Sequence, residues 1–234
     1  MEMNSESIDQ TNRLFQAMKD SIIVSCQVPE NTPINTPEFI SAQAQTVIQA
    51  GAAGIRAQGI LNVKAVASVV NAPVIGLVKR FSTESPIHIT PVIDDVIQLE
   101  KVGAKIVAID ATGRKRPGGL GLEEFISLIR ENTSIKILAD VDSFEAGIIA
   151  ENLGCDAVAT TLSGYTEKLA PDLPNIEILE KLPNRLSIPL IAEGGFSLPS
   201  QLIQAFNAGA WSICIGTAIT NPYILTQNFI KSLG

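Results

Sequence analysis

Cysteine and long apolar runs are scarce in this chain of 234 residues, and each scarcity excludes a class of protein. The three cysteines, Cys26, Cys155 and Cys214, are an odd number without CxxC spacing. This argues against a disulfide framework and a zinc site, and favours a reducing compartment. No uninterrupted apolar stretch approaches the roughly 18 residues of a membrane span. The first 20 residues lack the basic and apolar regions of a secretory signal.

Positive charge is also in short supply. The chain has 17 lysine and arginine residues against 24 aspartate and glutamate residues, a net charge of −7, which argues against a general nucleic-acid surface. A composition of 46% hydrophobic and 18% charged residues is typical of a globular protein rather than a disordered one. We therefore expect a soluble cytoplasmic protein that binds neither nucleic acid nor membrane.

What the chain does have is a repeating alternation of short apolar runs and longer amphipathic segments. The candidate strands are residues 21–28, 54–58, 73–79, 105–111, 136–141, 156–162, 189–194 and 211–216. Helical patterns between them include residues 36–51, 89–103, 122–132, 143–154 and 198–209, and several begin at Ser, Thr or Pro and end at Gly.

This alternation predicts an α/β fold in which a parallel sheet is buried on both faces. Eight units of about 30 residues fill the chain and fit a TIM (β/α)8 barrel. The alternative is an open doubly wound sheet, but that fold usually carries a glycine-rich turn after its first strand, and residues 25–33 contain no glycine. We expect a single domain over residues 1–234, with residues 1–20 forming an extra helix packed over the bottom of the barrel.

Polar residues gather where the predicted strands end, and in a TIM barrel these C-terminal ends hold the active site. The alternative is that each strand simply becomes polar where it meets water. The residues concerned are Cys26, Gln27, Arg56, Lys79, Arg80, Asp110, Asp140, Thr160, Thr161, Glu193, Gly216 and Thr217.

Lys79 is the most informative of these residues. A lysine at a barrel mouth can be a general base, a Schiff-base nucleophile or an anion clamp. As a base it needs a pKa lowered from about 10.4 toward roughly 7 to 8, which burial and the neighbouring cations Arg80 and Arg56 would favour. Glu193, on a distant strand, is the candidate partner acid. In isolation, either residue would be read as half of an ion pair.

Glycines at the ends of the last two strands carry a second pattern, because TIM barrels often bind phosphate in these loops. Backbone N–H groups of Gly194, Gly195, Gly216 and Thr217 are therefore candidate phosphate ligands. Glycines also occur in such loops only to make tight turns.

The chain resembles the N-acylglucosamine-6-phosphate 2-epimerase family over almost the full predicted barrel. The matching segments are "IVSCQ" (23–27), "AAGIRAQG" (52–59), "PVIGLVKR" (73–80), "ITPVIDDV" (89–96), "AIDATGRKRPGG" (108–119), "LADVDSFEAGIIAENLGCDAVATTLSGYT" (138–166), "IAEGGFS" (191–197) and "IGTAITNP" (215–222). The resemblance implies a TIM barrel and a homodimer that needs no cofactor or metal. It also implies conversion of N-acetylmannosamine 6-phosphate to N-acetylglucosamine 6-phosphate in amino-sugar and sialic acid catabolism.

The same resemblance assigns roles to residues. Lys79 would be the catalytic base and Glu193 its acid/base partner, while Gln27, Arg56 and Asp140 would hold the sugar and its acetamido group. Thr161, at the end of the sixth strand, joins these as a substrate-binding candidate. The only histidine, His88, is expected to pack rather than to react.

The chain departs from the family pattern at the expected phosphate site. Gly195 and Asn221 stand where family members usually have arginine, and Thr217 where they have glycine. A lost charge-assisted contact of about 1.5 to 3 kcal/mol would weaken phosphate binding roughly ten- to a hundredfold, so we expect altered phosphate affinity or an altered substrate.

Three alternatives to the epimerase stay open at this stage. A Schiff-base aldolase or lyase would also use a barrel lysine, and a different sugar-phosphate isomerase or epimerase would use the same chemistry. A noncatalytic phosphosugar-binding barrel would explain the missing arginines.

Arg114 and Arg116, in the loop after the fourth strand, either reach the substrate or lie in a solvated loop.

Overall fold

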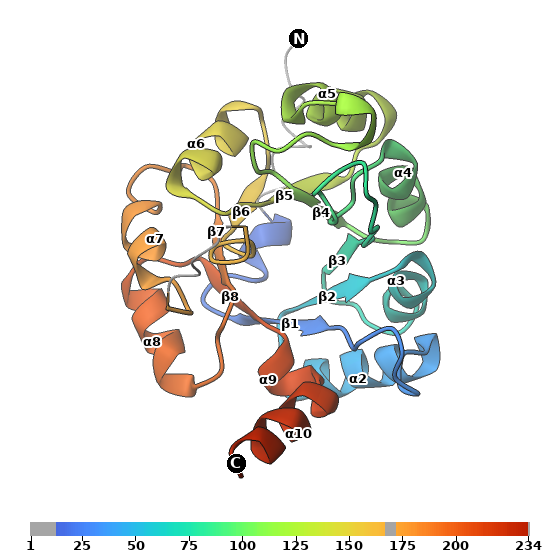
Figure 1. Ribbon diagram of the computed structural model, residues 1–234, viewed down its shortest axis with the longest axis vertical. Helices are drawn as coiled ribbons and strands as arrows, with labels where there is room; N and C mark the ends of the chain where they lie inside the picture. Colours follow the sequence, from blue (N-terminus) through green and yellow to red (C-terminus); the bar gives the residue numbers. More distant parts are fainter. Residues whose placement is uncertain (1–12, 167–171, 234) are drawn as a thin grey trace.

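The computed structural model describes residues 13–166 and 172–233, and its strands form a closed barrel in which every neighbouring pair is parallel (Figure 1). The strands follow one another around the barrel in sequence order, and β8 pairs with β1. This confirms the TIM barrel and excludes the open sheet. The strands are β1 (Ile22–Cys26), β2 (Gly54–Gln58), β3 (Val74–Leu77), β4 (Ile106–Asp110), β5 (Lys136–Asp140), β6 (Ala157–Ala159), β7 (Leu190–Glu193) and β8 (Ser212–Ile215).

Helices surround the barrel and cover the outer face of the sheet (Figure 1). Two of them begin with side-chain caps that the sequence predicts, since the hydroxyls of Thr36 and Ser143 accept from Phe39 N and Ala146 N. No helix of the described residues is long and apolar enough to cross a membrane. The helices are α2 (Pro37–Gln49), α3 (Ile60–Ala67), α4 (Ile93–Lys101), α5 (Leu122–Asn132), α6 (Phe144–Asn152), α7 (Ile176–Lys181), α8 (Pro199–Asn207), α9 (Thr217–Thr220) and α10 (Pro222–Lys231), with a 3-10 turn at Pro117–Gly119.

Side chains alternate between two hydrophobic clusters along each strand, as they must in a pleated sheet. In β4, for example, Val107 and Ile109 pack outward against the helices, while Ile106 and Ala108 belong to the cluster inside the barrel. Two residues further along, Asp110 continues the inward series. The alternation therefore decides which residues at the strand ends face the barrel axis.

The described part of the predicted N-terminal helix lies against the start of the strands. Residues 13–16 are helical, and Phe15 and Met18 are buried in the inner cluster. The indole N–H of Trp211 donates to Phe15 O at 2.8 Å. Gly54 leaves room for the Met18 side chain, because a Cβ on residue 54 would lie 2.8 Å from Met18 Sδ. Residues 1–12 of the predicted helix lie outside the described residues.

The segment after β3 differs from the helix expected over residues 89–103, since α4 begins only at Ile93. Ile89 instead forms an antiparallel bridge with Lys79 and joins the inner cluster. Thr90 is fully buried with φ of +42°, and its hydroxyl donates to Ala108 O at 2.7 Å while its N–H donates to Val78 O at 2.7 Å. The first residues of the predicted helix, 89–92, thus belong to a loop that folds back onto the end of β3 and fixes the backbone beside Lys79.

Candidate active site

Alternation along the strands brings most of the predicted site residues to the inside of the barrel mouth. Five of them lie two residues beyond a member of the inner cluster on the same strand, Gln27 lies four residues beyond Ile23, and Arg56 lies between Ile55 and Ala57, which pack outward. The residues concerned are Gln27, Arg56, Lys79, Asp110, Asp140, Thr161 and Glu193.

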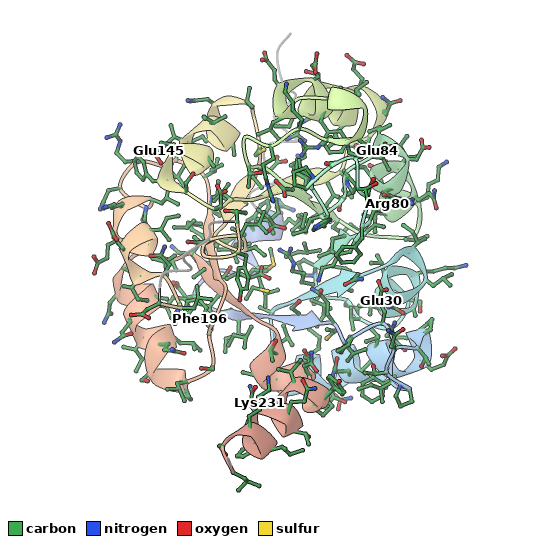
Figure 2. The ribbon with its side chains drawn as sticks, viewed as in Figure 1. Glu30, Arg80, Glu84, Glu145, Phe196 and Lys231 are labelled. Carbon is green, nitrogen blue, oxygen red and sulfur yellow. The ribbon has the colours of Figure 1, made fainter. Side chains whose placement is uncertain are left out.

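Arg80 is not among them, because consecutive residues of an extended chain point to opposite sides. Its guanidinium lies outside the barrel and pairs with Asp95 of α4, with Nε–Oδ2 at 2.6 Å and Nη2–Oδ1 at 2.7 Å. Figure 2 shows Arg80 at the edge of the molecule beside α4. The expectation that Arg80 lowers the pKa of Lys79 is therefore wrong.

Arg56 is the centre of a buried charge cluster. Its guanidinium binds Asp140 through two hydrogen bonds, of 2.9 Å to Oδ1 and 2.6 Å to Oδ2, and binds Glu193 Oε2 at 2.9 Å. Arg56 is 1% exposed and Asp140 is fully buried. Burial acts to lower the pKa of Arg56, but the two carboxylates outweigh it and raise that pKa. Thr161 donates to Asp140 Oδ1 at 2.6 Å and completes the cluster.

Lys79, two residues after the end of β3, faces this cluster and contacts a neutral side chain. Its Nζ donates to Gln27 Oε1 at 3.0 Å, and Gln27 Nε2 donates in turn to Ser25 Oγ at 2.6 Å. Burial lowers the pKa of Lys79 below its ordinary 10.5, and the Arg56 cation lowers it further, while Glu193 acts in the opposite direction. The sequence pattern missed Ser25, although its place two residues before Gln27 on the same inward series could have indicated it.

Glu193 has the complementary shift. Burial raises its pKa above the ordinary 4.5, Arg56 opposes that rise, and Asp140 reinforces it. Its backbone is fixed by Thr160, whose hydroxyl donates to Glu193 O at 2.8 Å and accepts from Glu193 N at 3.0 Å. β3 and β7 are four strands apart in a ring of eight, so Lys79 and Glu193 face each other across the barrel. The site therefore pairs a lysine shifted toward its neutral form with a glutamate shifted toward its protonated form.

A cavity of about 420 Å3 opens beside Lys79, over the ends of β1, β2 and β3. Lys79 and Glu30 are its only charged lining residues among those described. The others are neutral: Cys26, Gln27, Val28, Asn35, Ile40, Gln58, Gly59, Asn62 and Val78. Such a lining suits an uncharged ligand portion that has polar and apolar sides.

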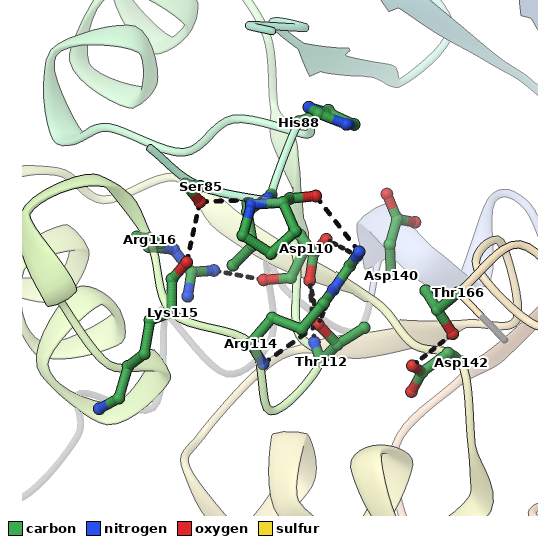
Figure 3. Close-up of polar contacts among 12 residues, drawn as sticks. Ser85, His88, Asp110, Thr112, Arg114, Lys115, Arg116, Asp140, Asp142 and Thr166 are labelled. Carbon is green, nitrogen blue, oxygen red and sulfur yellow. Dashed lines mark hydrogen bonds and ion pairs between the residues drawn. The ribbon is translucent and has the colours of Figure 1, made fainter. Parts of the chain in front are cut away.

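A second polar cluster lies on the β4 side of the mouth (Figure 3). The carboxylate of Asp110 accepts from Arg114 Nη2 at 2.6 Å and from the Thr112 hydroxyl at 2.7 Å. Arg116 is 1% exposed, donates to Asp110 O and stacks 4.3 Å from the Phe125 ring centroid. The expectation of a solvated loop is wrong for Arg116, because this side chain fastens the loop to the end of β4.

The predicted phosphate residues lie at the ends of β7 and β8. Gly194 and Gly195 have φ of +111° and +77°, a region that favours glycine, and Gly216 and Thr217 begin α9. Asn221 caps α10, since its Oδ1 accepts from Ile224 N at 3.1 Å.

Two other expectations concern the surroundings of the site. No group of three or more His, Cys, Asp or Glu side chains that could hold a metal ion occurs in the part of the chain the structure covers. The His88 ring lies 4.7 Å from the ring of Phe81, at the outer side of the loop after β3.

Comparison with protein families and curated proteins gives consistent results. A family profile described as "Putative N-acetylmannosamine-6-phosphate epimerase" matches residues 40–234. A protein of Caldanaerobacter subterraneus subsp. tengcongensis, named "Putative N-acetylmannosamine-6-phosphate 2-epimerase", is 40% identical over 221 residues, which are 93% of this chain and 92% of that protein. A protein of the same name from Thermosynechococcus vestitus is 36% identical, covering 94% and 96%.

Solved structures agree with this. The structure of the N-acetylmannosamine-6-phosphate 2-epimerase from Clostridium perfringens matches with a TM-score of 0.88 and 36% identity, over 93% of this chain and 95% of that one. Thiamine phosphate pyrophosphorylase from Pyrococcus furiosus matches with a TM-score of 0.62 at 16% identity, over 94% and 100%, and therefore shares the fold alone.

Proposed function

Because this chain belongs to the N-acetylmannosamine-6-phosphate epimerase family, we propose that it inverts C2 of N-acetylmannosamine 6-phosphate to give N-acetylglucosamine 6-phosphate. It is an enzyme, an epimerase of amino-sugar metabolism. The observation that carries the proposal is the pair formed by Lys79 and Glu193, whose pKa values are shifted in opposite directions on facing strands.

The reaction follows from this pair. In the open-chain sugar the C2 proton is next to an aldehyde, so neutral Lys79 removes it and leaves an enolate. The electrons of the C2–H bond form the C1–C2 double bond, and the negative charge develops on the aldehyde oxygen. Arg56 stabilises that charge. Protonated Glu193 then delivers a proton to the other face of C2, and exchange with solvent restores both groups.

The remaining site residues bind the substrate in this proposal. Gln27, Arg56, Asp140 and Thr161 hold the sugar and its acetamido group, and backbone N–H groups of Gly194, Gly195, Gly216 and Thr217 receive the phosphate. The hydrogen bonds of Gln27 to Lys79 and of Thr161 to Asp140 support these roles, since they connect each residue to the reacting centre. The reaction needs no cofactor, and we place it in the cytoplasm, in the degradation of sialic acids.

Proton NMR in D₂O tests the function directly. With N-acetylmannosamine 6-phosphate, the purified protein is expected to produce N-acetylglucosamine 6-phosphate that carries deuterium at C2, because the proton is removed by one group and replaced from exchanged solvent. Borohydride treatment in the presence of substrate serves as the control for a Schiff base, and no covalent product at Lys79 is expected. Substrate recovered without deuterium or epimerisation from folded protein would contradict the proposal.

The exposed C-terminal helix supports a homodimer. No residue of α10 is buried, and Phe229 and Ile230 are 74% and 61% exposed. Large apolar side chains on an otherwise uncovered helix are typical of an interface. We expect a dimeric mass in size-exclusion chromatography with light scattering, and a monomeric mass for the double variant Phe229→Asp, Ile230→Asp.

The matched control for this test is Thr226→Asp, which adds a charge to an exposed polar position of the same helix. It is expected to leave the dimer intact. A monomeric starting protein, or a dimer that survives the double variant, contradicts this assignment of the interface.

A further inference from the structure

We infer that the same site also epimerises the unphosphorylated N-acylmannosamine, a neutral sugar whose C6 carries a free hydroxyl. The inference rests on the proposed function and extends its substrate class. It follows from the charge and the hydrogen bonding at the end of the site where the C6 substituent is expected to lie.

Positive charge is absent from the sequence that builds this end. Between Arg185 and Lys231 the chain contains one charged residue, Glu193, which is acidic. Both loops in which a TIM barrel holds phosphate, those after β7 and β8, lie within this stretch. A phosphate dianion therefore meets no guanidinium or ammonium group from these loops.

Two other cations of the described part of the mouth are paired with carboxylates. Arg56 is bound by Asp140 and Glu193, and Arg114 by Asp110 at 2.6 Å. Each carboxylate weakens the attraction of its cation for a dianion at the far end of the substrate.

Among the described residues, Lys79 and Arg116 have no carboxylate within ion-pair distance. Arg116 is buried against Asp110 O and the Phe125 ring at the end of β4, on the opposite side of the barrel from β8. In the proposed reaction Lys79 lies beside C2 rather than C6.

Several backbone donors of these loops are also occupied. The N–H groups of Ser197 and Leu198 both donate to Gln201 Oε1, at 2.8 and 2.9 Å. The N–H of Ile224 donates to Asn221 Oδ1. α9 is a single turn of four residues, too short to add an appreciable dipole.

The donors that remain in these loops are neutral backbone groups. Within the described residues, the N–H groups of Gly194, Gly195 and Thr217 have no hydrogen-bond partner. Leu173 packs closely against Gly195, because a Cβ on Gly195 would lie 2.3 Å from Leu173 Cβ. This leaves no room at Gly195 for a longer side chain unless Leu173 moves.

A neutral hydroxyl is well suited to such a place. It can accept from one of these N–H groups and needs no counter-charge, whereas a dianion loses its hydration and gains only neutral donors in return. The phosphate should therefore add little to transition-state binding. We expect kcat/KM for the 6-phosphate to exceed that for the unphosphorylated sugar by less than about a hundredfold.

The test compares N-acetylmannosamine 6-phosphate and N-acetylmannosamine with the purified protein, using NMR to follow deuterium entry at C2. A preference for the phosphate below a hundredfold supports the inference, and a larger preference overturns it. If neither sugar reacts, the proposed function fails. If only the 6-phosphate reacts, the function stands and the inference fails.

A positive charge added near the end of β8 tests whether missing charge is the reason for the small preference for the 6-phosphate. Asn221→Arg places a guanidinium beside the β8 end and is expected to raise the preference for the 6-phosphate at least about tenfold, mainly through a lower KM. Asn221→Ser keeps a capping side chain without the charge, and Thr226→Arg adds the same charge further along α10; both are expected to keep the original preference. An Asn221→Arg protein with unchanged preference contradicts the electrostatic explanation.

Discussion

Replacing Lys79 with methionine is expected to lower kcat for epimerisation by about a hundred- to ten-thousandfold, with the barrel still folded. Methionine has nearly the length of lysine but cannot accept a proton. Within the described residues, the half-buried Nζ makes one hydrogen bond, to Gln27 Oε1, so its removal leaves one amide oxygen to find another donor or water. Steady-state NMR assays measure kcat, and loss of deuterium entry at C2 shows that proton abstraction is the step affected.

The pH dependence of this reaction identifies the base. A lysine whose pKa is lowered becomes neutral at a lower pH than an ordinary one, so kcat/KM should rise with pH through a limb that lies below 10.5. The residual activity of Lys79→Met should lack that limb. Lys64→Met, an exposed lysine on α3, is the control and should behave like the starting protein. A Lys79→Met protein that retains the limb would show that another group removes the proton.

Much of the fold could be predicted because the strands are buried on both faces. Continuous apolar runs such as residues 105–111 leave little choice of secondary structure, and eight of them in sequence order leave few closed arrangements. The exception is the segment around Thr90. Its apolar residues fit a helical period, but they are buried by a loop that folds back onto Lys79, and a local pattern does not reveal such a long-range contact.

The candidate site could be predicted in part for a similar reason. Lys79, Glu193, Arg56 and Asp140 all lie at strand ends, where the topology alone assigns them to one mouth. Their pairing could not be read from the sequence, since Arg56 and Asp140 are 84 residues apart in the chain.

The surroundings of Lys79 show most clearly what could not be predicted from neighbouring positions in the sequence. Arg80 is adjacent to Lys79 in sequence but lies outside the barrel, and Arg56, from a neighbouring strand, is the cation that lowers the pKa of Lys79. Sequence proximity suggested the wrong neighbour, and the alternation of side chains in the strand determines the right one.

Arg56→Met is expected to destabilise the protein by about 3–5 kcal/mol, the largest effect on stability that we predict, and to abolish most activity. The variant leaves the carboxylates of Asp140 and Glu193 close together in the barrel without their shared cation. Urea unfolding of the variant and the starting protein measures the difference in the free energy of unfolding. Lys181→Met is the control, because Lys181 pairs with Glu177 at the surface, where such a pair contributes little to stability.

The loss should depend on pH, and its sign follows from the protons bound. Burial already raises the pKa of Glu193 and Arg56 opposes that rise, so without Arg56 the folded pKa of Glu193 lies further above the unfolded value and the folded state binds this proton more tightly than the unfolded chain. The stability of the variant is then greatest below the ordinary carboxyl pKa and falls as pH rises toward 8. In the starting protein Arg56 opposes the rise in the pKa of Glu193 and makes this fall smaller. Adding Asp140→Asn to Arg56→Met removes one buried charge and should recover part of the loss at pH 8. Equal losses at pH 5 and pH 8, with no recovery in the double variant, would mean that packing rather than the buried charges holds this part of the barrel together.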